Sequence, residues 1–533
     1  MSETPAAVSG LTVSGLSVQG PNGTIVHPLD LAVPAGSMTA IIGESGSGKS
    51  MTARAITGLL PRGVTAQGTA TIDDYPYDLS GTSTSVWSRV RGRRAVLLLQ
   101  DPFTSLSPLY RCGDQIQWTL QSVRAGAERG TKHPRGALRD EMMRRLDEVH
   151  LPSRVASQYP FELSGGMRQR VAIAAALAAA PRLLIADEPT TALDASTQGE
   201  ILDLLHELQR SHRMSLILIS HNLGVVRGRA DDVIVMRHGE VVERGTAERV
   251  LTAPANAYTQ ALIDSNPALA DPVAPLTGAP RPVLVVSNIS KRFGANHALR
   301  SASVDVSAGE VVAVVGESGS GKSTLARCIA GLERPDDGTV ELEGLRLPSG
   351  RKGRTPGQVQ VVFQDPYSTL NPSFTVGSAL AEALRAAGKG ANRVDELLTL
   401  VGLDPALRDR RPAQLSGGQR QRVSIARALA PEPKLLICDE SVSALDVSVQ
   451  AQILALLEGL RERLDLAILF ITHDLGVVAR IANRVVVLRE GEVVERGTTE
   501  QVLSAPHHPY TQLLLAAAQR DSIAGSTPTE MTG

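Results

Sequence analysis

Apolar residues in this chain gather in short runs rich in β-branched side chains, separated by longer stretches with a helical period. The runs are MTAIIG, RLLIADE, SLILIS and DDVIVM in the first half, and VVAVVG, KLLICDE, AILFIT and RVVVLR in the second. Such runs are typical of parallel strands that helices cover on both faces. The pattern predicts an α/β fold. The segment from Gln100 to Ser164 and its counterpart in the second half are mostly helical in pattern and predict a helical lobe on each core.

The chain repeats itself. GESGSGKS at 43–50 recurs identically at 316–323, and LSGG, EVVERGT and YTQ each recur 252 residues later in the same order. Since 533 residues are too many for one core, two domains are expected. We place the first domain at 10–262, a linker rich in Pro and Ala at 263–282, the second domain at 283–519 and a polar tail at 520–533.

Charge and composition narrow the classes of function. The 54 Lys and Arg residues balance 55 Asp and Glu residues, so the net charge of −1 gives no basic footprint for nucleic acid. No stretch approaches the roughly 18 uninterrupted apolar residues of a membrane span, and the N-terminus does not resemble a signal peptide. The three cysteines, Cys112, Cys328 and Cys438, lack metal-like spacing and are expected to be buried small hydrophobes.

The repeated GESGSGKS lies between an apolar strand and the start of a helix, which is the context of a phosphate-binding loop. Its glycines let backbone amides turn toward phosphate oxygens, Lys49 and Lys322 would neutralise the β and γ phosphates, and Ser50 and Ser323 would ligate Mg²⁺. A plain glycine turn before a helix is the alternative. The expected loop residues are Gly43, Glu44, Ser45, Gly46, Ser47, Gly48, Lys49, Ser50, Gly316, Glu317, Ser318, Gly319, Ser320, Gly321, Lys322, Ser323 and Thr324.

LLIADE and LLICDE place two consecutive carboxylates at the end of an apolar strand. Asp187 and Asp439 suit the metal shell, and Glu188 and Glu440 suit polarisation of an attacking water. Taken alone, such paired acids are as often a solvated helix cap. Their place shortly after LSGG in both halves favours the site.

With these blocks in order, LSGGMRQRVAIAAALAAAPRLLIADEPTTALD and LSGGQRQRVSIARALAPEPKLLICDESVSALD resemble the signature, Walker B and D-loop motifs of ABC ATPases over nearly the whole chain. The resemblance implies two ATP-binding domains, each with a P-loop core and a helical subdomain. It also implies head-to-tail pairing of the halves around two ATP molecules. The signature residues facing ATP would be Ser164, Gly165, Gly166, Ser416, Gly417 and Gly418. These residues open a helix, and the amides and partial positive charge of a helix N-terminus favour binding of a γ-phosphate.

Other positions match the same family. Gln100 and Gln364 match the Q-loop that senses metal and water, His221 and His473 match the switch histidine, and Asp194 and Asp446 match the D-loop. Phe293 matches the aromatic ring that stacks on adenine. Its counterpart in the first half is Gly20, so the first site uses another apolar surface or binds adenine less firmly.

QDPFTSLSPLY, QDPYSTLNPSFTVG, EVVERGT and the AYTQAL and HPYTQLL endings resemble the peptide and nickel importer branch. This implies two integral-membrane permease subunits and an extracytoplasmic solute-binding protein as partners, with the chain on the cytoplasmic face of the membrane. Phe103, Leu106, Tyr367 and Leu370 are candidate contacts to a permease helix, and packing in the helical lobe is the alternative. Tyr258 and Tyr510 are expected to anchor the segment that follows each domain. That segment has no cysteine in 263–282, so no iron–sulfur cluster is expected.

A second class remains open: tandem ABC ATPases that act on the ribosome or on nucleic acid without a permease. Such translation factors carry a long charged helical linker, and the repair ATPases carry zinc cysteines or coiled coils, none of which this sequence contains. The importer is the favoured hypothesis. Peptide, metal chelate and glutathione-like solutes all stay possible.

Overall fold

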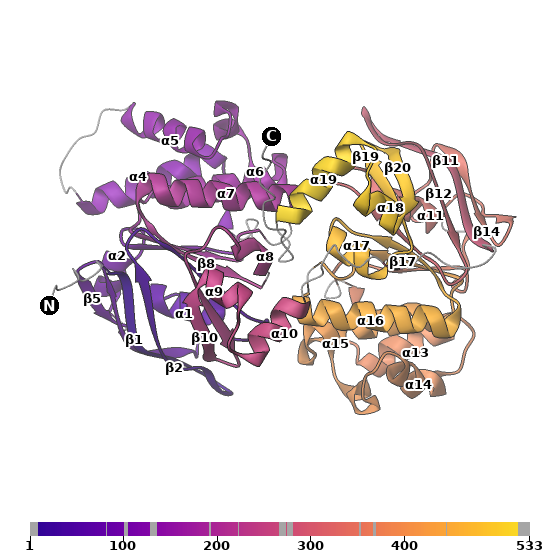
Figure 1. Ribbon diagram of the computed structural model, residues 1–533, viewed down its shortest axis with the longest axis horizontal. Coiled ribbons are helices and arrows are strands. Elements are labelled where there is room, and N and C mark those ends of the chain that lie inside the picture. Colours follow the sequence, from indigo (N-terminus) through magenta and orange to yellow (C-terminus); the bar gives the residue numbers. More distant parts are fainter. Residues whose placement is uncertain are drawn as a thin grey trace, which may run out of the picture. The chain divides into compact units, whose positions relative to one another are not determined.

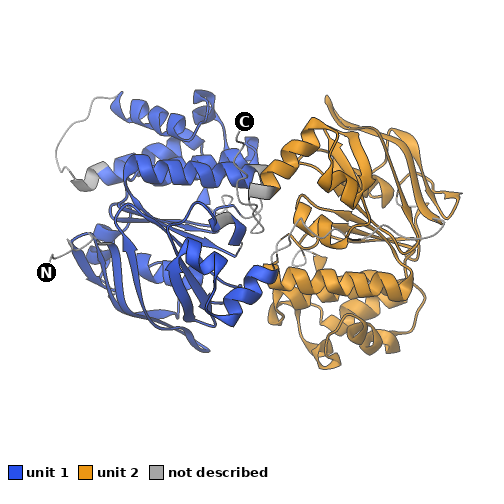
Figure 2. Cartoon of the chain, in the orientation of Figure 1, with its two compact units in different colours: residues 1–193, 197–264 blue, residues 194–196, 265–533 orange. Residues whose placement is uncertain are grey.

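The computed structural model describes residues 9–81, 83–100, 105–127, 136–190, 193, 195–221, 223–265, 273, 281–350, 353–365, 369–443 and 445–520. The chain divides into two compact units, one made of residues 1–193 with 197–264 and the other of 194–196 with 265–533 (Figure 2). The expected linker and tail lie largely outside the described residues. In the described part of the chain, no helix combines the length and the apolar character needed to cross a bilayer.

The elements of the first unit alternate between strands and helices (Figure 1). They are β1 (Ser9–Gly20), β2 (Gly23–Pro34), β3 (Met38–Ile42), α1 (Lys49–Thr57), β4 (Thr65–Ile72), β5 (Tyr75–Asp78), α2 (Thr84–Val90), β6 (Ala95–Leu98), α4 (Cys112–Ala127), α5 (Ala137–Glu148), α6 (Gly165–Leu177), β7 (Leu183–Asp187), α7 (Ala195–His212), β8 (Ser215–Ser220), α8 (Leu223–Val226), β9 (Asp232–Arg237), β10 (Glu240–Thr246), α9 (Ala247–Thr252) and α10 (Ala257–Ser265).

The second unit follows the same plan. Its elements are β11 (Pro282–Phe293), β12 (Asn296–Ser307), β13 (Val311–Val315), α11 (Lys322–Ile329), β14 (Asp337–Leu342), β15 (Leu345–Arg346), β16 (Val359–Val362), α13 (Val376–Ala386), α14 (Val394–Leu400), α15 (Gly417–Leu429), β17 (Leu435–Asp439), α16 (Val447–Leu464), β18 (Ala467–Ile471), α17 (Leu475–Ile481), β19 (Arg484–Arg489), β20 (Glu492–Thr498), α18 (Thr499–Ser504) and α19 (Pro509–Arg520).

Each unit contains a six-stranded sheet, in the order β10-β9-β3-β8-β7-β6 and β16-β17-β18-β13-β19-β20. All eight apolar runs identified in the sequence are strands of these sheets and pair in parallel there, while β10 and β20 join at one edge in antiparallel. Each unit also has a four-stranded antiparallel sheet, β2-β1-β4-β5 or β12-β11-β14-β15. The α/β prediction is confirmed. The second sheet was not anticipated, because its half-buried strands alternate polar and apolar residues.

Successive residues of the central strands feed two separate cores, since side chains alternate between the faces of a sheet. On β7, Leu183 and Ile185 pack toward α1 and the antiparallel sheet. Leu184 and Ala186 pack toward α7 and the helices α4, α5 and α6. Figure 1 shows these helices on one side of the six-stranded sheet and β1 and β2 on the other. This three-layer arrangement explains why the strand sequences are continuously apolar.

The predicted helical lobes are α4 to α6 and α13 to α15, which contact one another within each unit. Cys112, Cys328 and Cys438 are buried free thiols, as expected. Leu106 and Leu370 are members of the two lobe cores, with 4% and 2% of their surface exposed. The structure therefore assigns them to core packing. Phe103 and Tyr367 lie outside the described residues.

Truncation of these leucines should destabilise the lobes. We expect Leu106→Ala or Leu370→Ala to lower the free energy of unfolding by about 2–5 kcal/mol through lost burial and the cavity left behind. Leu109→Ala is the control, because Leu109 is 77% exposed, and it should change stability by less than about 0.5 kcal/mol. Denaturant unfolding followed by far-UV circular dichroism measures both. Equal effects at Leu106 and Leu109 would contradict the core assignment.

Candidate functional site

Each GESGSGKS segment forms a tight loop between a central strand and the following helix, β3 to α1 and β13 to α11. Three glycines of each loop have positive φ, among them Gly43 at 148° and Gly316 at 152°. A Cβ at either position would lie 2.1 Å from the carbonyl oxygen of Met236 or Leu488. Only glycine fits there, so the backbone closely approaches the neighbouring β9 or β19.

The loop lysines turn back into their own loops. Lys49 Nζ donates to the carbonyl oxygens of Gly43 and Glu44 at 2.7 and 2.9 Å, and Lys322 Nζ donates to Gly316 and Glu317, both at 2.7 Å. Both lysines are buried. The hydroxyls of Ser47 and Ser320 are buried without a hydrogen-bond partner among the described residues. Buried ammonium groups and unpaired hydroxyls at the N-terminus of a helix are the chemistry that a bound phosphate satisfies.

The remaining loop residues differ in solvent exposure and in backbone conformation. Ser45, Gly46, Glu317, Ser318 and Gly319 are exposed at the tips, Gly48 and Gly321 have positive φ just before the helices, and Thr324 is half-buried in α11.

Serine and aspartate from separate elements meet beside each loop. Ser50 Oγ donates to Asp187 Oδ1 at 2.8 Å, and Ser323 Oγ donates to Asp439 Oδ1 at 3.0 Å. Burial raises the pKa of both aspartates, and the charge of the adjacent glutamate raises it further, against the effect of the serine hydrogen bond. A hydroxyl and a carboxylate held together in this way form an all-oxygen donor set that suits Mg²⁺.

The predicted glutamate, glutamine and histidine converge in the first unit. Gln100 Nε2 donates to Glu188 Oε2 at 2.9 Å, and His221 Nδ1 lies 3.3 Å from Glu188 Oε1. The glutamine follows β6, the glutamate follows β7 and the histidine follows β8, so neighbouring strand ends bring them together. In the second unit His473 Nδ1 lies 3.5 Å from Glu440 Oε1, and Gln364 follows β16 at the corresponding place.

Both glutamates have a left-handed backbone, with φ of 47° at Glu188 and 49° at Glu440. Such a conformation is uncommon for a residue with a side chain and carries a local cost. The amide of Glu188 donates to the carbonyl of Ile219 at 3.0 Å, and that of Glu440 to Ile471 at 2.9 Å. Sheet pairing thus holds the turn that directs the carboxylate away from the strand.

LSGG opens a helix in each unit, α6 and α15. Ser164 Oγ accepts from the Met167 amide and Ser416 Oγ from the Gln419 amide, both at 3.3 Å. Gln419 also accepts from the Ser416 amide, which completes a capping box that methionine cannot form. The glycines have a packing role too. A Cβ at Gly166 would lie 2.5 Å from Thr197, and one at Gly418 would lie 2.6 Å from Val449.

The two positions proposed from the sequence for contact with adenine differ between the units. Phe293 ends β11 and is 50% exposed, with Lys291 Nζ 5.2 Å from its ring centre. Gly20 ends β1 at the equivalent place, where the side chain of Ile25 lies close to the position of the missing Cβ. The half-buried side chain of Ile25 therefore places an apolar group beside Gly20 in the first unit. Asp446 occupies the N-cap position of α16, while Asp194 lies outside the described residues.

Comparison with known proteins then decides the family. The model described as ABC transporter matches residues 26–191 and 299–443. The chain belongs to the ABC transporter family. The model described as Oligopeptide/dipeptide transporter, C-terminal region matches 242–295 and 494–528, after each ABC domain. The protein is therefore a tandem ABC ATPase of the oligopeptide and dipeptide branch, as the motifs in its sequence predicted.

Curated relatives are similar over almost the whole chain. The glutathione import ATP-binding protein GsiA of Pectobacterium atrosepticum is 40% identical over 549 residues, covering 94% of this chain and 87% of that protein. GsiA of Salmonella typhimurium is 40% identical over 561 residues, covering 95% and 89%. Among solved structures, the archaeal ribosome recycling factor aABCE1 is 20% identical with a TM-score of 0.62 over 94% of this chain and 92% of that one. That likeness shows the fold alone.

Sequence reasoning missed one contact of this ABC ATPase. The hydroxyl of Tyr258 accepts from the Glu44 amide at 3.1 Å, and that of Tyr510 from the Glu317 amide at 2.9 Å. The tyrosines were expected only to anchor the segments that follow each domain. The recurrence of YTQ in both halves was the available signal, but a sequence does not show which backbone group a hydroxyl will meet.

The contact between His473 and Glu440 predicts how the stability of the folded protein depends on pH. Burial lowers the pKa of His473, but the hydrogen bond and charge of Glu440, together with the charge of Asp474, outweigh burial, so the net pKa is raised. A raised folded-state pKa means that the pairing stabilises the fold fully below the unfolded value of about 6.5. The contribution is lost as the pH rises through the folded-state pKa.

We therefore expect the stability difference between the wild type and His473→Gln to be largest near pH 6 and to shrink toward pH 9. Nucleotide-free denaturant midpoints across this range measure it. A difference that stays constant or grows with pH would contradict the assigned pairing.

Proposed function

We propose that this chain is the ATP-hydrolysing subunit that energises a membrane importer for peptides or related small solutes. The observation that carries the proposal is the presence, in both units, of a complete set of phosphate-loop, acidic and histidine residues, each followed by the C-terminal region of the oligopeptide branch. The relatives named as glutathione import proteins support the same class of solute. We propose glutathione or another short peptide as the solute.

The roles of the loop residues follow from their chemistry. Lys49 and Lys322 exchange their carbonyl partners for the β and γ phosphates of ATP, and the loop amides and serine hydroxyls complete the contact. Ser50 with Asp187, and Ser323 with Asp439, would hold Mg²⁺, with Gln100 and Gln364 completing the shell. When bound, the ion neutralises charge on the phosphates.

Water activation is assigned to Glu188 and Glu440. Each carboxylate lies at the carboxyl edge of the sheet beside a histidine, at the distances given above. In this role the glutamate accepts the proton of the attacking water. The histidine orients that carboxylate and contacts the γ-phosphate side of the site. Gln100 donates a hydrogen bond to the second carboxylate oxygen of Glu188.

We further propose that the two domains, placed at 10–262 and 283–519, pair head-to-tail. Ser164, Gly165 and Gly166 then face the ATP held by Lys322, and Ser416, Gly417 and Gly418 face the ATP held by Lys49. The support is that each triplet opens a helix whose first amides are available to an anion. The two sites differ: one combines Phe293 with α6, which Ser164 caps by a single hydrogen bond, and the other combines Ile25 with α15, which begins with a complete capping box.

Two integral-membrane permeases and an extracytoplasmic solute-binding protein are the proposed partners, with the chain at the cytoplasmic face. A groove of about 1120 Å³ in the first unit supports a permease contact. Its lining includes Arg89, Arg91 and Arg93 and the exposed ring of Trp118. The basic side chains and the exposed aromatic ring suit a short amphipathic helix.

Loss of the glutamates tests the catalytic assignment. We expect Glu188→Gln or Glu440→Gln alone to lower the rate of ATP hydrolysis, and the double variant to lose about 10²-fold or more, the usual contribution of a general base. Steady-state phosphate release measures the rate, and ATP binding should persist in all three. An unchanged rate in Glu188→Gln would rule out two active sites.

The importer assignment is tested with the same double variant, which should retain bound ATP and its partners. Affinity purification from detergent-solubilised membranes with ATP and Mg²⁺, followed by mass spectrometry, should recover two multi-span permeases. A wild-type preparation with ADP serves as the control. Recovery of ribosomal proteins or nucleic-acid factors without a permease would favour the soluble class instead.

A further inference from the structure

The segment that follows each ABC domain reaches the phosphate loop through one hydroxyl group. Tyr258 is the second residue of α10 and Tyr510 is the second residue of α19. Each accepts a hydrogen bond from the first peptide of its loop, at 3.1 and 2.9 Å. The two helices differ in sequence around the shared YTQ, yet both units make the same contact.

That peptide also holds the loop lysine. The N–H of the peptide between Gly43 and Glu44 donates to Tyr258, while its C=O accepts from Lys49 Nζ at 2.7 Å. The peptide between Gly316 and Glu317 repeats the pattern with Tyr510 and Lys322. Because hydrogen bonds to both ends of one peptide polarise each other, the tyrosine hydroxyl and the lysine ammonium are linked through a single rigid unit.

The tyrosines are themselves held from two sides. Arg237 and Arg489 lie over the rings of Tyr258 and Tyr510, 4.6 and 4.9 Å from the ring centres. Both rings are almost fully buried. The helix starts are capped by different residues with the same effect, since Asn256 accepts from the Tyr258 amide at 2.8 Å. His508 accepts from the Tyr510 amide at 3.1 Å.

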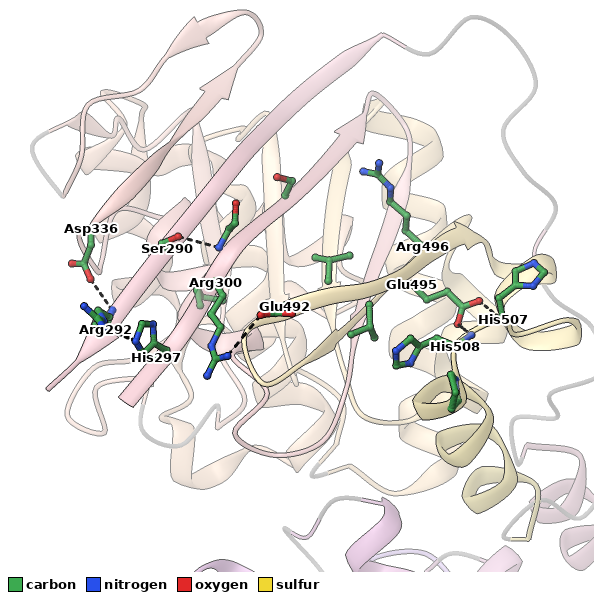
Figure 3. Close-up of a pocket in the computed structure, with 16 residues that line it drawn as sticks. Ser290, Arg292, His297, Arg300, Asp336, Glu492, Glu495, Arg496, His507 and His508 are labelled. Atoms are coloured by element: carbon green, nitrogen blue, oxygen red, sulfur yellow. Dashed lines mark hydrogen bonds and ion pairs between the residues drawn. The ribbon is translucent and has the colours of Figure 1, made fainter. Parts of the chain in front are cut away.

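A glutamate of EVVERGT secures the turn before each helix. Glu243 accepts from the amides of Ala255 and Asn256, at 2.8 and 3.1 Å. Glu495 accepts from those of His507 and His508, at 2.7 and 3.2 Å, as Figure 3 shows. The open pocket drawn there is lined in part by Glu495, His507 and His508, and its lining includes no residue of the phosphate loop. The hydrogen bonds of Glu243 and Glu495 therefore fix the tyrosine relative to β10 or β20 and do not involve the phosphate loop.

We propose that Tyr258 and Tyr510 are positioning residues for ATP: each orients the first peptide of its phosphate loop and so sets the place of the lysine that meets the phosphates. The C-terminal segment of each domain is then part of the ATP site in addition to any contact with partners. The proposal rests on the ATP-binding role assigned to the loops and is independent of the transported solute.

The test is Tyr258→Phe and Tyr510→Phe, singly and together, in the full chain carrying Glu188→Gln and Glu440→Gln so that ATP binding is measured without hydrolysis. Loss of one hydrogen bond should weaken ATP binding about 3- to 10-fold at the changed site. In the hydrolytically competent chain, the KM for ATP should rise by a similar factor while kcat changes less than about twofold, since the lysine contacts phosphate before and during the reaction.

Tyr77→Phe is the matched control. Its hydroxyl also makes one buried hydrogen bond, to the carbonyl of Ile56 at 2.9 Å, on the antiparallel sheet side of α1. It should reduce thermal stability but leave ATP affinity within about twofold. Tyr258→Phe and Tyr510→Phe variants that bind ATP as tightly as the parent chain would overturn the proposal. So would a Tyr77→Phe variant that weakens ATP binding equally. Failure of the parent chain to bind ATP would instead overturn the proposed function.

Discussion

The buried lysine at the start of α1 and of α11 is the charge around which each GESGSGKS loop is arranged. Lys49 and Lys322 are 4% and 5% exposed, and an ammonium group removed from water is costly unless polar groups surround it. Two carbonyl oxygens of the loop supply those partners. The loop can present them only because glycine permits its backbone to approach the adjacent strand so closely. The strand before each loop and the helix after it hold these groups in place.

The parallel sheet gathers the remaining chemistry at one edge. Strand ends of β6, β7 and β8 deliver an amide, two carboxylates and an imidazole beside the loop, each from a different part of the sequence. The glutamates accept a left-handed backbone to point their carboxylates there, and cross-strand amide bonds stabilise that turn. The same edge in the second unit repeats the arrangement. The equivalent residues of the two units can therefore be compared within one chain.

That comparison shows which features tolerate change. The lysine, serine, aspartate, glutamate and tyrosine contacts recur with closely similar distances in both units. The residues proposed to contact the base and the second bond of the capping box do not recur, since Gly20 with Ile25 replaces Phe293 and Met167 replaces Gln419. Contacts to phosphate are constrained by charge and geometry, whereas an apolar surface for a base can be built from several side chains.

Sequence alone determined the duplication, the strand runs, the phosphate loops and the ABC family, because those features depend on local spacing that a motif records. It did not predict the antiparallel sheets, whose half-buried strands lack a continuous apolar run. Nor did it separate core packing from partner contact at Leu106 and Leu370. Only the tertiary structure showed that Tyr258 and Tyr510 meet the loops, more than 190 residues away in sequence. Such a contact depends on how distant helices pack, and local sequence carries no record of that packing.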